Sequence, residues 1–136
     1  MQPIAVRRVS IDVESPAHSA DEAPVVLLVT ADTNLREAAA RALAREGYRV
    51  LTAAHSGHAV LACLQAGHVD VAAIELSMDD GSGPKLAGRL LRHCPEMRAV
   101  FFAERGTPEA EGFLVRPFDR DDLLAEMGLA LVPIAL

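Results

Sequence analysis

The sequence contains few aromatic residues and few cysteines. It has no Trp, one Tyr and four Phe, so the core of this 136-residue chain has to be built from Ala, Leu and Val. Its two cysteines, Cys63 and Cys94, lack CxxC spacing, and such cysteines are more often reduced and buried than bridged. We therefore expect one domain without a structural disulfide.

The chain also lacks clustered positive charge and long apolar runs. Its formal net charge is −6, and no Lys or Arg block extends beyond Arg7-Arg8. Nucleic acids and anionic membranes bind clustered cations, so neither is expected as a partner. Apolar runs such as Ala23–Val29 are far shorter than the ~20 residues of a membrane helix, and the first residues lack the order of a signal peptide. We expect a cytoplasmic protein.

The two ends of the chain differ from its middle. Residues 1–23 form an arm in which Val9–Glu14 alternates between apolar and polar residues, followed by a linker-like stretch. The arm is either frayed or an extra edge strand, added to its own sheet or to that of a neighbour. Residues 132–136 form a tail that is too short to bind DNA or to catalyse a reaction.

Residues 24–131 alternate between strand and helix patterns, which predicts a parallel sheet covered on both faces. The strand pattern at Tyr48–Thr52 is more polar than the one before it, at Val25–Val29, and is expected at an edge of the sheet. Strands are expected at Val25–Val29, Tyr48–Thr52, a third stretch ending at Glu75, Arg98–Ala103 and Gly112–Val115. Helices are expected from a Thr33 cap to Gly47, with Leu35, Ala38, Ala39, Ala42 and Leu43 inward; from Ser56 through Val60, Leu61 and Leu64 to Gly67; from Pro84 to before Pro95, with Leu86, Leu90 and Leu91 inward; and from an Asp119 cap to Leu131, with Leu123, Leu124 and Met127 inward.

The third strand carries the acid that most needs an explanation. Residues 69–74 are almost continuously apolar, which is typical of a strand buried on both faces, and Glu75 follows at the carboxyl end. Open α/β sheets place their chemistry at this end of the strands. A loop over Ser77–Gly83 is expected next, in which Asp79 and Asp80 serve turn formation.

One connection is shorter than a parallel sheet normally requires. Only residues 104–111 separate the fourth and fifth strands, whereas a crossover with its helix takes about a dozen residues. Thr107–Glu109 allows a single helical turn at most. The sheet is therefore expected to be thinly covered beside these two strands.

In order and spacing, several segments together resemble a response-regulator receiver domain of two-component signalling. The matching segments are Val26–Val29, Asn34–Arg36, Gly47–Ala54, Asp70–Met78 with Gly83, and Phe113–Phe118. The resemblance implies a flavodoxin-like (CheY-like), doubly wound sheet of five parallel strands in the order 2-1-3-4-5. In this chain the crossover helix between strands 4 and 5 is shortened.

The same resemblance assigns roles that this sequence fills with other residue types. Receivers transfer a phosphoryl group to their own aspartate, using two acids that hold a divalent cation, a hydroxyl and a lysine. The equivalent positions here are Glu75 for the aspartate, Thr30 and Ala31 for the acid pair, Ala103 for the hydroxyl, and Arg116 before Pro117 for the lysine, with Asp32 as a remaining pocket acid. No catalytic residue, metal site or cofactor is therefore expected, and any Mg²⁺ binding should be weak.

Glu75 and Arg116 carry opposite charges in this pocket. We expect a two-pronged carboxylate–guanidinium contact between them that fixes one conformation. Glutamate carries −1, against about −1.5 to −2 for a phosphorylated side chain, so it imitates the modified state only in part. The alternative is that Glu75 is a solvated strand-end acid in a pocket that has drifted without purpose.

The function that follows is regulatory protein–protein interaction in a two-component or phosphorelay pathway, not enzymatic catalysis. The expected partner is a histidine kinase or another signalling protein, and a homodimer is a further alternative. Because the helix before the last one is reduced, contacts through the first and last helices or the arm are favoured. Two other readings stay open: unorthodox phosphorylation at Glu75 or Asp79, and a small-ligand module on the same fold.

Overall fold

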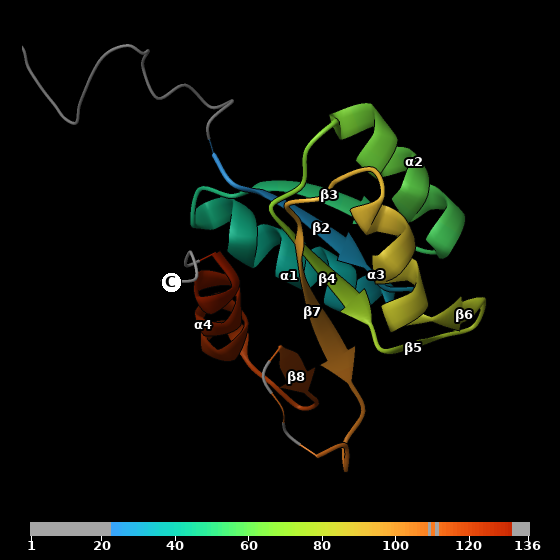
Figure 1. Ribbon diagram of the computed structural model, residues 1–136. Coiled ribbons are helices and arrows are strands. Elements are labelled where there is room, and N and C mark those ends of the chain that lie inside the picture. The colour runs from blue at the N-terminus through green and yellow to red at the C-terminus, as the bar shows by residue number, and fades with distance from the viewer. Residues whose placement is uncertain (1–22, 109, 111, 132–136) are drawn as a thin grey trace, which may run out of the picture.

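The computed structural model describes residues 23–108, 110 and 112–131, and its centre is a five-stranded parallel sheet (Figure 1). The strands are β2 (Val25–Val29), β3 (Arg49–Ala53), β4 (Val71–Glu75), β7 (Arg98–Ala103) and β8 (Phe113–Val115). Their spatial order is β3-β2-β4-β7-β8, which confirms the predicted order 2-1-3-4-5 and the edge position of the second strand. The predicted arm strand and the tail lie outside the described residues.

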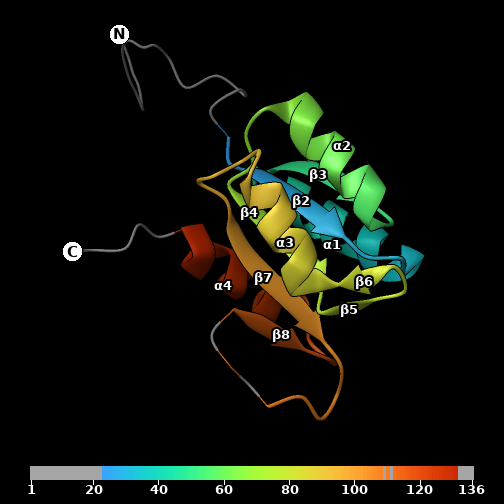
Figure 2. The same ribbon diagram turned by 45° about the vertical axis from the view of Figure 1, so that its right-hand side comes forward.

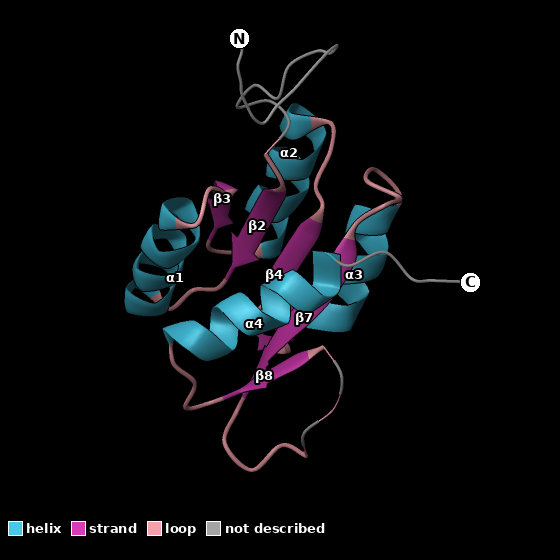
Figure 3. Cartoon of the chain, turned by 90° about the vertical axis from the view of Figure 1, so that its left-hand side faces the viewer, coloured by secondary structure: helices cyan, strands magenta, loops and turns pink. Residues whose placement is uncertain are grey.

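Two helices cover each face of the sheet. The helices α1 (Thr33–Arg45) and α4 (Arg120–Leu131) lie on one face (Figure 3), and α2 (Ser56–Ala66) and α3 (Gly83–Leu91) lie on the other. The central strands β2 and β4 are buried along their whole length except at Glu75, as their unbroken apolar sequences predict. Each face has its own apolar core, one containing Leu27 and Ile74 and the other Leu28 and Phe102.

The helix starts are set by side-chain caps. Asp119 caps α4 as predicted: its Oδ1 accepts the Asp122 N–H at 2.8 Å, and the Asp122 carboxylate accepts the Asp119 N–H at 3.1 Å. The predicted cap of α1 was wrong by one residue. The cap is Asp32, whose backbone is extended and whose carboxylate accepts the Leu35 N–H at 3.1 Å, whereas Thr33 is already helical.

Two predicted inward positions are wrong: Ala38 of α1 is exposed, and Leu91 of α3 is 39% exposed. In α2, Leu61 and Leu64, to which the sequence assigned no face, are 50 and 53% exposed. In α2 the buried positions are Ala59 and Cys63, one turn apart. Small side chains allow a helix axis to approach a sheet closely, so the inward face of α2 is its small-residue face and not its leucine face.

The predicted loop after β4 is a two-stranded hairpin. Its strands are β5 (Ser77–Met78) and β6 (Gly81–Ser82), with Asp79 and Asp80 at the turn as expected. The hairpin leads into α3 at Gly83, whose N–H donates to the Leu76 carbonyl at 2.9 Å. A Cβ atom on Gly83 would lie 2.2 Å from the carbonyl oxygen of Glu75, so only glycine fits beside this strand end.

The short crossover between β7 and β8 has no helix in its described residues, as predicted. The chain turns at Arg105–Gly106, extends away from the sheet and returns to β8 (Figure 2). The predicted helical turn at Thr107–Glu109 does not form at Thr107 and Pro108, and Glu109 lies outside the described residues. Phe101 and Phe113 pack edge to face, 6.1 Å apart, and both remain half-buried because the crossover places no helix over them.

Within the described part of the chain, every helix is too short or too polar to cross a lipid bilayer.

Candidate functional site

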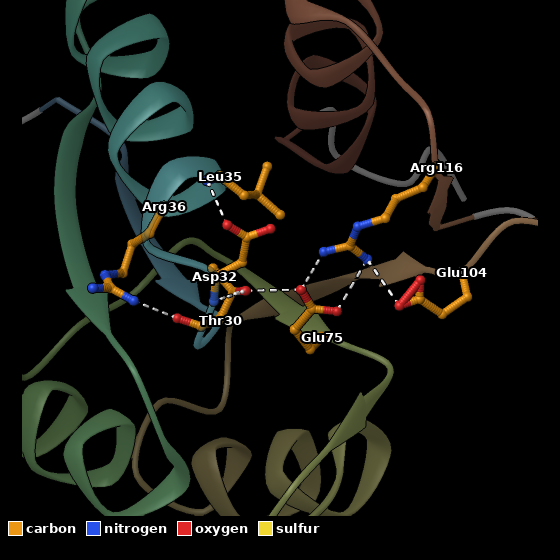
Figure 4. Close-up of polar contacts among 7 residues, drawn as sticks. All are labelled: Thr30, Asp32, Leu35, Arg36, Glu75, Glu104 and Arg116. Atoms are coloured by element: carbon orange, nitrogen blue, oxygen red, sulfur yellow. Dashed lines mark hydrogen bonds and ion pairs between the residues drawn. The ribbon is translucent and has the colours of Figure 1, made fainter.

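The candidate site lies at the carboxyl ends of β2, β4 and β8. Thr30 follows β2, Glu75 ends β4, and Arg116 follows β8, so parallel strands bring three distant parts of the chain to one edge (Figure 4). A cavity of about 360 Å³ opens there. Its lining includes Thr30, Ala31, Asp32, Glu75, Asp79, Asp80, Glu104 and Arg116.

Glu75 and Arg116 form the predicted two-pronged pair. Nη1 of Arg116 donates to Oε2 of Glu75 at 3.2 Å, and Nη2 donates to Oε1. The two side chains are only 14 and 24% exposed. The hydrogen bonds and charge of Glu75 raise the pKa of Arg116 above its ordinary value, against the opposing effect of burial. The alternative of a solvated strand-end acid is contradicted by this burial and pairing.

Thr30 supplies a third hydrogen bond to the same carboxylate. Its Oγ1 donates to Oε1 of Glu75 at 2.8 Å and accepts the Asp32 N–H at 3.1 Å. The residue is 1% exposed, and its carbonyl accepts a hydrogen bond from Arg36 at 2.7 Å. Thr30 was identified from the sequence only as the loss of an acid. Its role as a donor depends on the pairing of β2 with β4, which places its hydroxyl beside Glu75.

The remaining predicted pocket residues divide into two groups. Ala31 and Asp32 line the cavity, and both are exposed. Ala103 and Pro117 do not line it. The Ala103 methyl is 1% exposed at the end of β7 and is too short to reach the cavity. Pro117 lines a different cavity, beside α4.

Glu104 is an acid of the cavity that the sequence did not single out. It follows β7 and is 75% exposed, with its Oε1 4.0 Å from Nη1 of Arg116. At this distance and exposure it contributes little to holding the guanidinium. Arg116 is therefore held mainly by Glu75.

The donor groups of the cavity do not fit Mg²⁺. This ion requires near-octahedral oxygen ligands including free carboxylates. Both oxygens of Glu75 are bonded to Arg116, and an oxygen of Asp32 caps α1. Among the residues that the structure describes, no group of three or more His, Cys, Asp or Glu side chains is arranged to hold a metal ion.

The hairpin turn forms the outer wall of the cavity. Asp80 accepts hydrogen bonds from the Ser56 N–H at 3.0 Å and the Ser56 hydroxyl at 3.1 Å. These bonds hold the pKa of Asp80 below its ordinary value and tie the hairpin to the start of α2. His55 caps that helix through Nδ1, which accepts the His58 N–H at 3.2 Å. Asp79 is exposed at the same turn.

Comparisons with known proteins agree with this fold. A family model described as the response regulator receiver domain matches residues 26–127. The receiver domain of the hybrid histidine kinase CckA is 26% identical, with a TM-score of 0.70 over 79% of this chain and 99% of that one. The chemotaxis response regulator CheY4 of Vibrio cholerae is also 26% identical, with a TM-score of 0.69 over 80 and 99% of the two chains.

A CheY-like receiver domain protein from Methanospirillum hungatei JF-1 is more distant. It is 21% identical and has a TM-score of 0.69 over 80% of this chain and 94% of that one, which shows a shared fold. No curated protein sequence matches the chain.

Proposed function

The chain belongs to the response regulator receiver domain family, and we propose that it is a receiver that regulates by protein–protein contact without the usual phosphorylation cycle. It is a receiver domain of two-component signalling. In our proposal, Glu75 stands at the phosphoacceptor position, Thr30 and Ala31 at the acid pair, and Arg116 at the lysine position. The domain then acts as a non-enzymatic binding module in the cytoplasm.

The observation that carries the proposal is the set of hydrogen bonds that the Glu75 carboxylate already accepts. Its two oxygens accept three hydrogen bonds, two from Arg116 and one from Thr30. A phosphoryl group attached to Glu75 would have to displace the guanidinium from the carboxylate. It would also have to form without a fitting cation site or a hydroxyl at Ala103. The pocket is better suited to holding its own ion pair than to accepting a phosphoryl group.

The ion pair gives the domain one stable arrangement at this edge of the sheet. Charge-assisted, two-pronged contacts fix both the distance and the orientation of the two groups. Arg116 leads directly to the Asp119 cap of α4, so the pair connects β4 with the start of the last helix. A partner that contacts this part of the molecule would meet a surface whose conformation is fixed by the ion pair and does not depend on phosphorylation.

The surface available to such a partner follows from the short crossover. The described residues between β7 and β8 form no helix. A homodimer that needs a helix at this crossover, paired with α4, is therefore disfavoured. We propose α1 and α4 as the contact surface, with a histidine kinase or another signalling protein as the partner. Both helices border the candidate site, because Asp32 precedes α1 and Arg116 precedes α4.

The test is capture of partners from a lysate of the source organism on immobilised protein. We expect the wild type to retain a signalling partner, and retention to be unchanged by acetyl phosphate with Mg²⁺. Glu75→Ala should lose it, because Arg116 is released. Glu104→Ala is the matched control, since this acid lies beside Arg116 but is mostly exposed. Equal retention by the wild type and Glu75→Ala would contradict the proposal.

Two observations keep other functions in view. Asp79 is exposed and lines the same cavity as Glu75, which favours it as an unorthodox phosphorylation site. The cavity volume of about 360 Å³ falls at the lower end of the range for small-ligand pockets. An increase in intact mass with a phosphodonor would support the first, and a ligand-dependent rise in melting temperature would support the second.

A further inference from the structure

The two cysteines of the chain meet in the core between α2 and the connection from α3 to β7. Cys63 lies in α2 and Cys94 lies 31 positions later, yet their Sγ atoms are 2.7 Å apart. Their side chains are 0 and 2% exposed and belong to the same apolar cluster. Both are free thiols. Since a disulfide bond is about 2.05 Å long, the sulfur atoms have to approach by less than 1 Å to form one.

Backbone hydrogen bonds hold the chain in place around Cys94. The Cys94 N–H donates to the Leu90 carbonyl at 2.8 Å, and its own carbonyl accepts the Met97 N–H at 3.1 Å. The Cys94 sulfur lies 3.9 Å from the Cys63 carbonyl, and the Cys63 sulfur lies 4.0 Å from the Leu90 carbonyl. No third metal-binding side chain joins them among the described residues, so a metal site does not explain the pair.

We propose that Cys63 and Cys94 form an oxidation site, which hydrogen peroxide converts into an intramolecular disulfide between α2 and the α3–β7 connection. Peroxide is close to water in size, which suits a pair this deeply buried. The proposal is independent of how the cavity at Glu75 functions.

The reaction takes place in two steps that balance. Cys94, the more exposed of the two, loses its proton to water and its sulfur attacks one peroxide oxygen. The O–O bond breaks, hydroxide leaves, and Cys94 becomes a sulfenic acid. The Cys63 sulfur then attacks the Cys94 sulfur, so that the S–S bond forms, the S–O bond breaks and water leaves with the Cys63 proton. The two thiols lose two electrons, and the peroxide takes them up and yields two water molecules.

Burial makes this reaction slow but selective. Burial and the neighbouring Cys94 thiol raise the pKa of Cys63 to about 12, so its thiolate is scarce at neutral pH. A thiol at this position reacts poorly with bulky reagents. It is nevertheless placed to trap a sulfenic acid on its neighbour before further oxidation.

The bond would close a covalent ring that contains Glu75, one of the three residues of the candidate site. Residues 63–94 include β4 with Glu75, the β5–β6 hairpin and α3. A cross-link over a ring of this length limits the unfolded chain, so the melting temperature should rise by several degrees. Oxidation would also tie α2 covalently to the connection that follows α3.

The experiment treats the folded full-length chain with hydrogen peroxide, denatures it, alkylates free thiols and measures the intact mass. We expect the loss of two hydrogen atoms with no alkylation, and recovery of two alkylated thiols after dithiothreitol. Proteolysis should yield one cross-linked pair of peptides containing Cys63 and Cys94. In guanidinium a smaller fraction of the oxidised chains should carry this cross-link, because only the fold holds the second sulfur beside the sulfenic acid.

Cys63→Ala and Cys94→Ala are the matched controls, each checked for folding by circular dichroism. Neither should gain a cross-link within one chain. The proposal is overturned if two alkylatable thiols survive in the folded wild type, or if oxygen atoms are added to either cysteine without a cross-link. It is also overturned if the cross-link joins two chains. The wild-type result decides these points even if a variant fails to fold.

Discussion

Strand β4 has an acid near each of its ends, and the two acids are bound in different ways. Asp70 precedes the strand, and its carboxylate accepts the backbone N–H of Val25 at 2.7 Å and contacts Nε2 of His68 at 2.8 Å. Glu75 ends the strand, and the hydrogen bonds to its carboxylate come from the side chains of Thr30 and Arg116. Both acids join β4 to the β2 segment. Asp70 binds a backbone N–H of β2, and Glu75 binds the side chain of Thr30, which follows β2.

The difference separates framework from site. The bond from Asp70 completes the start of the β2–β4 ladder, where the Asp70 N–H also donates to the Val25 carbonyl at 2.9 Å. Its donor is a backbone N–H, whose position is set by the pairing of the strands. The bonds of Glu75 can be exchanged by rotating side chains, with the sheet left intact. The same strand therefore ends in a fixed acid at its amino end and a changeable one at the edge where parallel sheets carry function.

The largest predicted effect tests how rigid the strand backbone is at the changeable end. Gly83→Ala should lower the free energy of unfolding by about 3 kcal/mol, because the new Cβ would meet the backbone carbonyl of Glu75 at 2.2 Å. Gly88→Ala in the same helix is the control and should raise it by about 0.5–1 kcal/mol, since nothing lies within 4 Å. Urea unfolding measures both. A neutral Gly83→Ala would show that the strand end is free to move.

The next largest effect should come from the framework acid. Asp70→Ala removes an acceptor from a backbone N–H and should cost about 2 kcal/mol of unfolding free energy. Asp70→Asn keeps an acceptor oxygen and should cost about half as much. If Asp70→Ala cost no more than substitution of Glu75, the distinction between the two ends of the strand would fail.

A smaller effect is expected at Thr30. Thr30→Val keeps the shape but removes the hydroxyl that bonds Glu75 and accepts from Asp32, so it should cost about 1 kcal/mol. Thr30→Ser should retain most of the stability, since it keeps the oxygen. Equal losses for the two variants would mean that packing of the methyl group, and not the hydrogen bond, is the contribution of this residue.

The smallest stability effect should come from the site acid itself. Glu75→Gln should cost less than about 1 kcal/mol, because the amide has the same shape and keeps an acceptor oxygen, and Glu104 remains near Arg116. Its effect on partner retention should nevertheless be large, since the neutral amide holds the guanidinium weakly. Unfolding in urea and retention on immobilised protein would measure the two effects separately.

The sequence predicted the strands and helices that depend on local residue patterns. It also predicted one contact between side chains of opposite charge. Unbroken apolar runs identified β2 and β4, and the short stretch before β8 excluded a full helix. The Glu75–Arg116 pair was predictable because the resemblance places two opposite charges in one pocket. The strand order was given by resemblance to a family and not by periodicity.

What the sequence did not predict depends on geometry between distant segments. Thr30 was missed as a donor because a hydroxyl shows no preference for a partner until β2 and β4 are placed side by side. The inward face of α2 was not predicted, because apolar residues on both sides of a helix leave that face undetermined. The nearness of Cys63 and Cys94 had no signal in their spacing.

The most direct test of the central claim is the intact mass of the folded protein after incubation with acetyl phosphate and Mg²⁺, beside a receiver that retains the aspartate, the acid pair and the lysine. If the Glu75–Arg116 pair has replaced phosphoryl transfer, the control gains the mass of a phosphoryl group and this chain keeps its own mass. A labile added phosphate on this chain, at Glu75 or Asp79, would contradict the account.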